Sequence, residues 1–171
     1  MNPIHAHQTI LIVEDNDEDY EATLRAFQHA KVVNPLRRCV DGDDALDYLH
    51  QRGKYNADSA TKPGLMLLDI NMPGTDGREV LRQVKAHEHL KKIPVIVLTT
   101  SGYDLDVEEC YAIGANSYVQ KPVEISSFFA AIHKLQEYWL GLTLLPKTEV
   151  FNAEISGEFG QGQDKNSEPM P

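Results

Sequence analysis

The chain has 171 residues and a formal net charge of -10 at pH 7. Since domains usually hold about 100–150 residues, this length allows one folded domain with an extension. The acidic surface would repel nucleic-acid phosphates and anionic membranes, so we expect neither as a partner. No apolar stretch approaches the roughly 20 residues that span a bilayer, and the polar first eight residues do not form an export signal, so we expect a cytoplasmic protein.

Short apolar runs alternate along the chain with segments of helical periodicity. The runs predict five strands, at residues 10–13, 36–40, 65–68, 95–98 and 117–119. After each run, apolar residues recur every three or four positions, which predicts a helix. Strands that are apolar throughout have to be covered on both faces. The sequence therefore predicts an α/β fold in which a parallel sheet lies between two layers of helices.

The composition divides the chain into four parts. We predict a flexible N-terminus over 1–8, one folded domain over 9–140, an extension over 141–155 and a disordered tail over 156–171, which is rich in Gly, Gln and Ser. Too few residues follow Tyr138 for a DNA-binding or cyclase module. The expected output is therefore contact with another protein.

Charged residues follow several of the predicted strands at the points where the strands end. Glu14 and Asp15 follow the first strand, Asp69 follows the third and Lys121 follows the fifth. The carboxyl ends of parallel strands meet at one edge of the sheet, where open α/β sheets bind their ligands. We therefore expect three carboxylates and one lysine to share a cleft, around an aspartate that could accept a phosphoryl group.

This set of residues suits a magnesium ion. Mg²⁺ prefers octahedral oxygen ligands and keeps several waters. Suitable oxygens are offered by the carboxylates of Glu14, Asp15 and Asp69 and by the main-chain carbonyl of Asn71. The ion would offset the negative charge that builds on a phosphoryl group during transfer, and Lys121 would neutralise the resulting acyl phosphate.

Each part of the predicted cleft also has a plainer interpretation. Residues 69–73 could form an ordinary turn, and residues 14–17 could form a helix N-terminus, where acidic side chains are stabilising. Lys121 and Pro122 could belong to a simple loop. What favours a phosphorylation site is the occurrence of all these parts, in order, at the ends of the appropriate strands.

These residues resemble the receiver domain of two-component response regulators, and the resemblance runs from about Thr9 to Tyr138. It implies a flavodoxin-like, doubly wound sheet of five parallel strands in the order 2-1-3-4-5, with five helices. It also implies roles for single residues. Asp69 would be the phosphoacceptor and Lys121 would contact the phosphoryl group.

The same resemblance assigns the metal ligands. Asp15 would bind Mg²⁺ directly, Glu14 largely through water, and Asn71 through its main-chain oxygen. In addition, the resemblance implies a cis peptide bond between Lys121 and Pro122 that would aim the lysine inward.

Two further residues match the switch of the family. Thr99, five residues after Pro94, corresponds to a hydroxyl that turns inward to bond a phosphoryl oxygen. Tyr118, three residues before Lys121, corresponds to the aromatic side chain that follows it. Without the resemblance, Thr99 would be interpreted as an ordinary strand residue and Tyr118 as an amphipathic edge residue.

A narrower resemblance is to the single-domain response regulators of bacterial and cyanobacterial phytochromes. It depends on residues 98–101 and 115–118, and on residues 137–141 followed by Pro146. It implies a light-regulated sensor histidine kinase, a phytochrome, as the phosphoryl donor. The last helix and its extension carry apolar residues beyond one buried face, so we expect a homodimer through them, unless the segment 142–151 folds back on its own domain.

Three other functions were compared with this one. A Mg²⁺-dependent phosphohydrolase of the haloacid-dehalogenase type would need a second aspartate at position 71, where this chain has Asn71. A nucleotide-binding switch would need a Gly-rich phosphate loop ending in Lys-Ser or Lys-Thr, which the sequence lacks. A phosphorylation-independent interaction module is the third alternative, but it would not need the complete set of cleft residues.

Overall fold

The computed structural model describes residues 8–55 and 61–146, which form a parallel sheet in the order β2-β1-β3-β4-β5. The strands are β1 (Thr9–Val13), β2 (Leu36–Cys39), β3 (Pro63–Leu68), β4 (Val95–Thr99) and β5 (Ser117–Gln120). The helices are α1 (Asp17–His29), α2 (Gly42–Leu49), α3 (Gly77–Ala86), α4 (Asp104–Ile113), α5 (Ile125–Gln136) and a π-helical turn, η1 (Glu137–Leu142). The predicted α/β class and flavodoxin-like strand order are confirmed.

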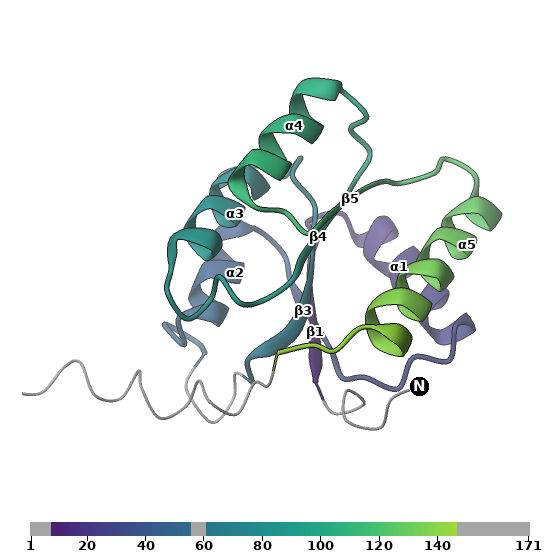
Figure 1. Cartoon of the computed structure of the whole chain (residues 1–171), viewed down its shortest axis with the longest axis horizontal. Helices are drawn as coiled ribbons and strands as arrows, with labels where there is room; N and C mark the ends of the chain where they lie inside the picture. The colour runs from purple at the N-terminus through teal and green to yellow at the C-terminus, as the bar shows by residue number, and fades with distance from the viewer. Residues whose placement is uncertain (1–7, 56–60, 147–171) are drawn as a thin grey trace, which may run out of the picture.

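Helices cover both faces of the sheet. Figure 1 shows α1 and α5 on one side and α2, α3 and α4 on the other. Successive residues of β1 point to opposite faces, so that Leu11 packs in the core beneath α2 and α3, whereas Ile12 packs in the core beneath α1 and α5. Because both faces of the central strands are buried, β1, β3 and β4 are apolar at nearly every position, and the exceptions in β1 and β4 are two buried threonines, Thr9 and Thr99.

The C-terminal part of the described chain packs partly on its own domain. Leu140 and Leu145 are buried in the core beneath α1 and α5, and Gln8 Nε2 donates a hydrogen bond to the Pro146 carbonyl at 2.7 Å. Leu142 and Leu144 remain 75% and 78% exposed. The extension therefore folds back as far as Pro146, while two of its leucines stay on the surface.

Some of the predicted parts lie outside the described residues. These are most of the N-terminus over 1–8, the extension beyond residue 146, and the tail over 156–171. Among the residues that are described, none of the helices has the length and apolar character needed to cross a membrane.

Candidate functional site

Three of the predicted site residues, Glu14, Asp69 and Lys121, lie one position beyond their strands, at the carboxyl edge of the sheet. The main-chain N–H groups of Glu14, Asp69 and Lys121 donate hydrogen bonds to carbonyls at the ends of neighbouring strands, at 3.0, 3.0 and 2.7 Å. The hydrogen-bond ladder of the sheet thus extends to these three residues and fixes their backbones. Their side chains consequently meet at one place, although they are up to 107 residues apart in the sequence.

The ammonium group of Lys121 lies among three carboxylates. Its Nζ is 2.5 Å from Glu14 Oε2, 2.8 Å from Asp19 Oδ2 and 2.9 Å from Asp69 Oδ2. The side chains of Lys121, Glu14 and Asp69 are only 6%, 5% and 7% exposed, whereas that of Asp19 is 38% exposed. Three negative charges against one positive charge leave the cluster with an excess of two negative charges.

Asp19 was not predicted from the sequence. It lies in the first turn of α1, within the acidic run of residues 17–19 that is typical of a helix N-terminus. Carboxylate oxygens of Glu14, Asp19 and Asp69 lie within 4.8 Å of one another. Asp15 does not belong to this group of three, so its role as a metal ligand stays a prediction.

Burial and ion pairing shift the pKa values of two groups in this cluster, Glu14 and Lys121. Desolvation raises the pKa of Glu14 from 4.5 to about 6, because it outweighs the hydrogen bond and charge of Lys121. Burial disfavours the charged form of Lys121 as well. However, its hydrogen bonds to Asp19 and Glu14 and the charge of Asp69 together raise its pKa above the ordinary value. The lysine is therefore a permanent cation in this cleft.

The loop after β3 holds the Asp69 carboxylate in place. The Asn71 main-chain N–H donates to Asp69 Oδ1 at 2.9 Å, so one carboxylate oxygen faces the loop while Oδ2 faces Lys121. Asp76 caps α3, and Gly77 packs against the backbone of this loop. A Cβ atom at Gly77 would lie 2.1 Å from the Asp69 carbonyl oxygen, so only glycine allows this approach.

The predicted switch residues are joined through Ser101. The Thr99 Oγ1 atom accepts hydrogen bonds from Asn71 Nδ2 at 3.2 Å and from the Ser101 main-chain N–H at 3.4 Å. Tyr118 donates its hydroxyl to the Ser101 carbonyl at 3.1 Å, and Ser101 Oγ donates to the Asp106 carboxylate in α4. A continuous set of contacts thus connects the loop beside Asp69 with α4.

The predicted cis bond between Lys121 and Pro122 is wrong, because this peptide bond is trans in the structure. Lys121 still points into the cleft, where its ion pairs with Glu14, Asp19 and Asp69 hold the side chain.

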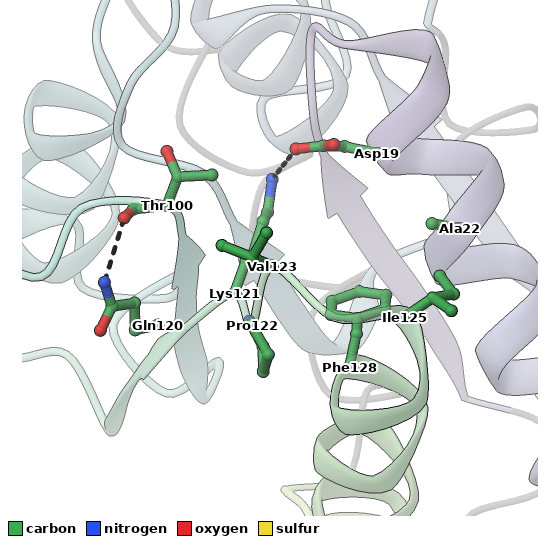
Figure 2. Close-up of a pocket in the computed structure, with 9 residues that line it drawn as sticks. All are labelled: Asp19, Ala22, Thr100, Gln120, Lys121, Pro122, Val123, Ile125 and Phe128. Atoms are coloured by element: carbon green, nitrogen blue, oxygen red, sulfur yellow. Dashed lines mark hydrogen bonds and ion pairs between the residues drawn. The ribbon is translucent and has the colours of Figure 1, made fainter.

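A cavity of about 360 Å³ opens beside this cleft, between α1 and the loop that follows β5. Figure 2 shows Asp19 and Lys121 meeting above it, with Phe128 and Ile125 of α5 on its wall. Val123 is fully exposed at its edge. The cavity thus joins a charged cleft to an apolar surface.

The sequence of this chain also matches a known protein family. Residues 10–133 match the model of the response regulator receiver domain, which is more than half of the chain. The chain belongs to this family.

Two relatives are similar to this chain over most of their length. The probable methanogenesis regulatory protein FilR2 of Methanothrix harundinacea is 39% identical over 139 residues, covering 80% of this chain and 86% of the relative. The crystal structure of the phosphorylated cyanobacterial phytochrome response regulator RcpA is 38% identical, with a TM-score of 0.78 over 82% of this chain and 99% of that chain.

A third relative was solved with a metal bound. The crystal structure of the Mn²⁺-bound form of the response regulator Rcp1, a protein of Synechocystis, is 35% identical to this receiver domain. Its TM-score is 0.77, over 82% of this chain and 99% of that chain. In the present chain, the carboxylates of Glu14, Asp19 and Asp69 carry two more negative charges than Lys121 offsets, and this excess fits a divalent cation.

Proposed function

We propose that this protein is a single-domain response regulator that accepts a phosphoryl group on Asp69, with Mg²⁺ as its cofactor. The observation that carries the proposal is the environment of Asp69, a buried carboxylate at the end of β3 whose Oδ2 lies 2.9 Å from Lys121 Nζ. We assign the metal to Glu14, Asp15, Asp69 and the main-chain oxygen of Asn71. When bound, Mg²⁺ would supply positive charge for the oxygens of the transferring phosphoryl group.

In the proposed transfer, a carboxylate oxygen of Asp69 attacks the phosphorus of a phosphohistidine. The new O–P bond forms as the N–P bond breaks, and the histidine nitrogen keeps the electron pair. Lys121 stands where it can pair with a phosphoryl oxygen. The protein acts as a phosphoacceptor in a signalling chain and has no turnover beyond gaining and losing its own phosphoryl group.

The proposed signal passes through Thr99 and Tyr118. A phosphoryl oxygen on Asp69 would draw the Thr99 hydroxyl away from its present partners, Asn71 and Ser101. Because the Tyr118 hydroxyl bonds the Ser101 carbonyl, a change at Thr99 would reach the surface formed by α4 and β5. Phosphorylation adds about -1.5 to -2 charges, which is a large local change for this contact set.

We propose a sensor histidine kinase of the phytochrome class as the phosphoryl donor. The similarity to RcpA over 82% of this chain supports this choice. The receiver domain would span 9–140, in a cytoplasmic protein that binds no nucleic acid. Homodimer formation through Tyr138, Leu142 and Leu144 is also proposed, since these side chains are at least half exposed.

The proposal is tested by incubating the protein with acetyl phosphate and Mg²⁺ and measuring its intact mass. The parent protein should gain one phosphoryl group, and Asp69→Asn should gain none. Asp76→Asn is the matched control, because asparagine caps a helix as well as aspartate does and should leave the gain intact. Phosphoryl uptake by Asp69→Asn would count decisively against the assignment.

A further inference from the structure

Lys121 pairs with three carboxylates, and it could not keep all three pairs if a divalent cation bound two of these carboxylates. An ammonium group has three N–H donors, and the contacts with Glu14, Asp19 and Asp69 use all three. A cation held by Glu14 and Asp69 would bind the same two carboxylates as Lys121 and would repel the ammonium group. The lysine and the cation thus compete for two of the three carboxylates.

Asp19 differs from the other two carboxylates in its position. Glu14 and Asp69 follow strands and are almost fully buried, whereas Asp19 belongs to α1 and is 38% exposed. Figure 2 shows its carboxylate reaching Lys121 from the α1 side of the cavity. A pair that includes Asp19 can stay partly hydrated, so it loses less hydration free energy than a pair with either buried carboxylate.

The local structure fixes Asp19 independently of Lys121. Its main-chain N–H donates to Asn16 Oδ1 at 3.0 Å, and its carbonyl accepts a hydrogen bond from Thr23 Oγ1 at 2.9 Å. These contacts keep the residue in the first turn of α1, where the helix dipole favours a negative charge. The backbone of Asp19 would therefore remain in place if Lys121 changed partners, with the carboxylate still within reach of the ammonium group.

We propose that Asp19 is a positioning residue that retains the Lys121 ammonium group at the edge of the cleft when a divalent cation takes the oxygens of Glu14 and Asp69. Asp19 thereby lets two positive groups share one acidic cleft. The inference rests on the proposed cation site and adds to it, because it gives Asp19 an effect on the cation that acts through Lys121 rather than by ligation.

A double-mutant cycle on Mn²⁺ binding separates an effect of Asp19 that acts through Lys121 from a direct effect of Asp19 on the cation. The dissociation constant of Mn²⁺ is measured by titration calorimetry at neutral pH for the parent, Asp19→Asn, Lys121→Met and the double variant. In the parent background, Asp19→Asn should raise the dissociation constant about tenfold, because Lys121 then stays on Glu14 and Asp69. In the Lys121→Met background, the same substitution should cost clearly less, because only the direct attraction between the Asp19 charge and the cation is then lost.

Glu18→Gln is the matched control, since it removes an exposed negative charge from the same turn of α1 and should change the dissociation constant by less than about twofold. An equal loss in both backgrounds would mean that Asp19 acts on the cation directly, by ligation or by its charge, and would overturn the inference, as would an Asp19→Asn protein that binds like the parent. Failure of the parent to bind Mn²⁺ would instead refute the cation site itself. Circular dichroism verifies folding, and Lys121→Gln replaces Lys121→Met if the latter does not fold.

Discussion

The acidic cleft and the ion-pair network between α3 and α4 use similar charges in different surroundings. In the cleft, Lys121 and two of its three carboxylates are less than one-tenth exposed. In the network, Arg82 pairs with Glu79 at 3.0 Å and with Glu109 at 2.6 Å, but these side chains are 43% to 47% exposed. Water screens the second set far more than the first, so equally short distances represent different energies.

The two regions also differ in how far their positive and negative charges balance. The cleft places three carboxylates around one lysine and leaves much of its excess negative charge out of water, which costs stability when no cation is bound. The network lies at the surface, where solvent compensates any mismatch. The cleft therefore has the properties of a binding site, and the network those of an ordinary solvated surface.

The largest loss of stability is expected for Lys121→Met in metal-free buffer. It removes the cation from three carboxylates that lie within 4.8 Å of one another, and breaking a buried pair in this way costs about 3 kcal/mol. Added Mg²⁺ should restore much of that loss, because it binds only the folded state. Urea unfolding with EDTA and with Mg²⁺ measures both effects. The control is Lys134→Met, at an exposed lysine of α5. If Lys121→Met were as stable as Lys134→Met in EDTA, the account would be contradicted.

A comparable loss is expected for Gly77→Ala. The new methyl group would overlap the Asp69 carbonyl and the Ile70 Cα atom, and such overpacking costs about 1–3 kcal/mol. It would also displace Asp69, so phosphoryl uptake should fall. Urea unfolding and intact mass measure the two effects. The control is Gly141→Ala, where the nearest atom would be 3.9 Å away; equal behaviour of the two variants would refute the argument from close approach.

Glu14→Gln should stabilise the metal-free protein at neutral pH. Because folding raises the pKa of Glu14 from 4.5 to about 6, the stability that comes from proton uptake is complete below about pH 4.5 and is lost as the pH rises through about 6. Glutamine resembles the protonated form, so at pH 7 the gain should approach about 2 kcal/mol.

Urea unfolding of Glu14→Gln at several pH values measures this gain, which should disappear below about pH 4.5. Glu21→Gln, at an exposed position of α1, should show no such dependence on pH. A Glu14→Gln protein that is less stable than the parent at pH 7 would show that the pair with Lys121 outweighs desolvation.

The smallest effect is expected in the surface network. Arg82→Ala removes the contacts with Glu79 and Glu109, yet it should leave the urea midpoint unchanged within error, because both pairs are solvated. A shift as large as that of Gly77→Ala would remove the contrast between the two regions.

The fold and most of the cleft could be predicted because they depend on local patterns. The apolar runs identify the strands, and parallel pairing brings their last residues together, so Glu14, Asp69 and Lys121 were expected to meet. Asp19 could not be found in this way. It lies in a helix among other acids, and only its contact with Lys121, 102 residues away, distinguishes it. Its place in the first turn of the helix that follows Glu14 and Asp15 was the one available signal.

The C-terminal extension shows a second limit of the sequence. Leu142, Leu144 and Leu145 have the same apolar character, yet Leu145 is 7% exposed and the other two are more than 70% exposed. The path of the backbone after η1 decides which of them meets the core, and no periodicity in so short a segment reveals that path.

The central claim is that the carboxylate of Asp69 takes up the phosphoryl group. The most direct measurement is to phosphorylate the protein with acetyl phosphate and Mg²⁺, reduce the acyl phosphate with borohydride and locate the resulting homoserine by peptide mass spectrometry. The account predicts homoserine at position 69 alone. Homoserine at Asp15 or Asp19, or at no position after verified phosphoryl uptake, would contradict it.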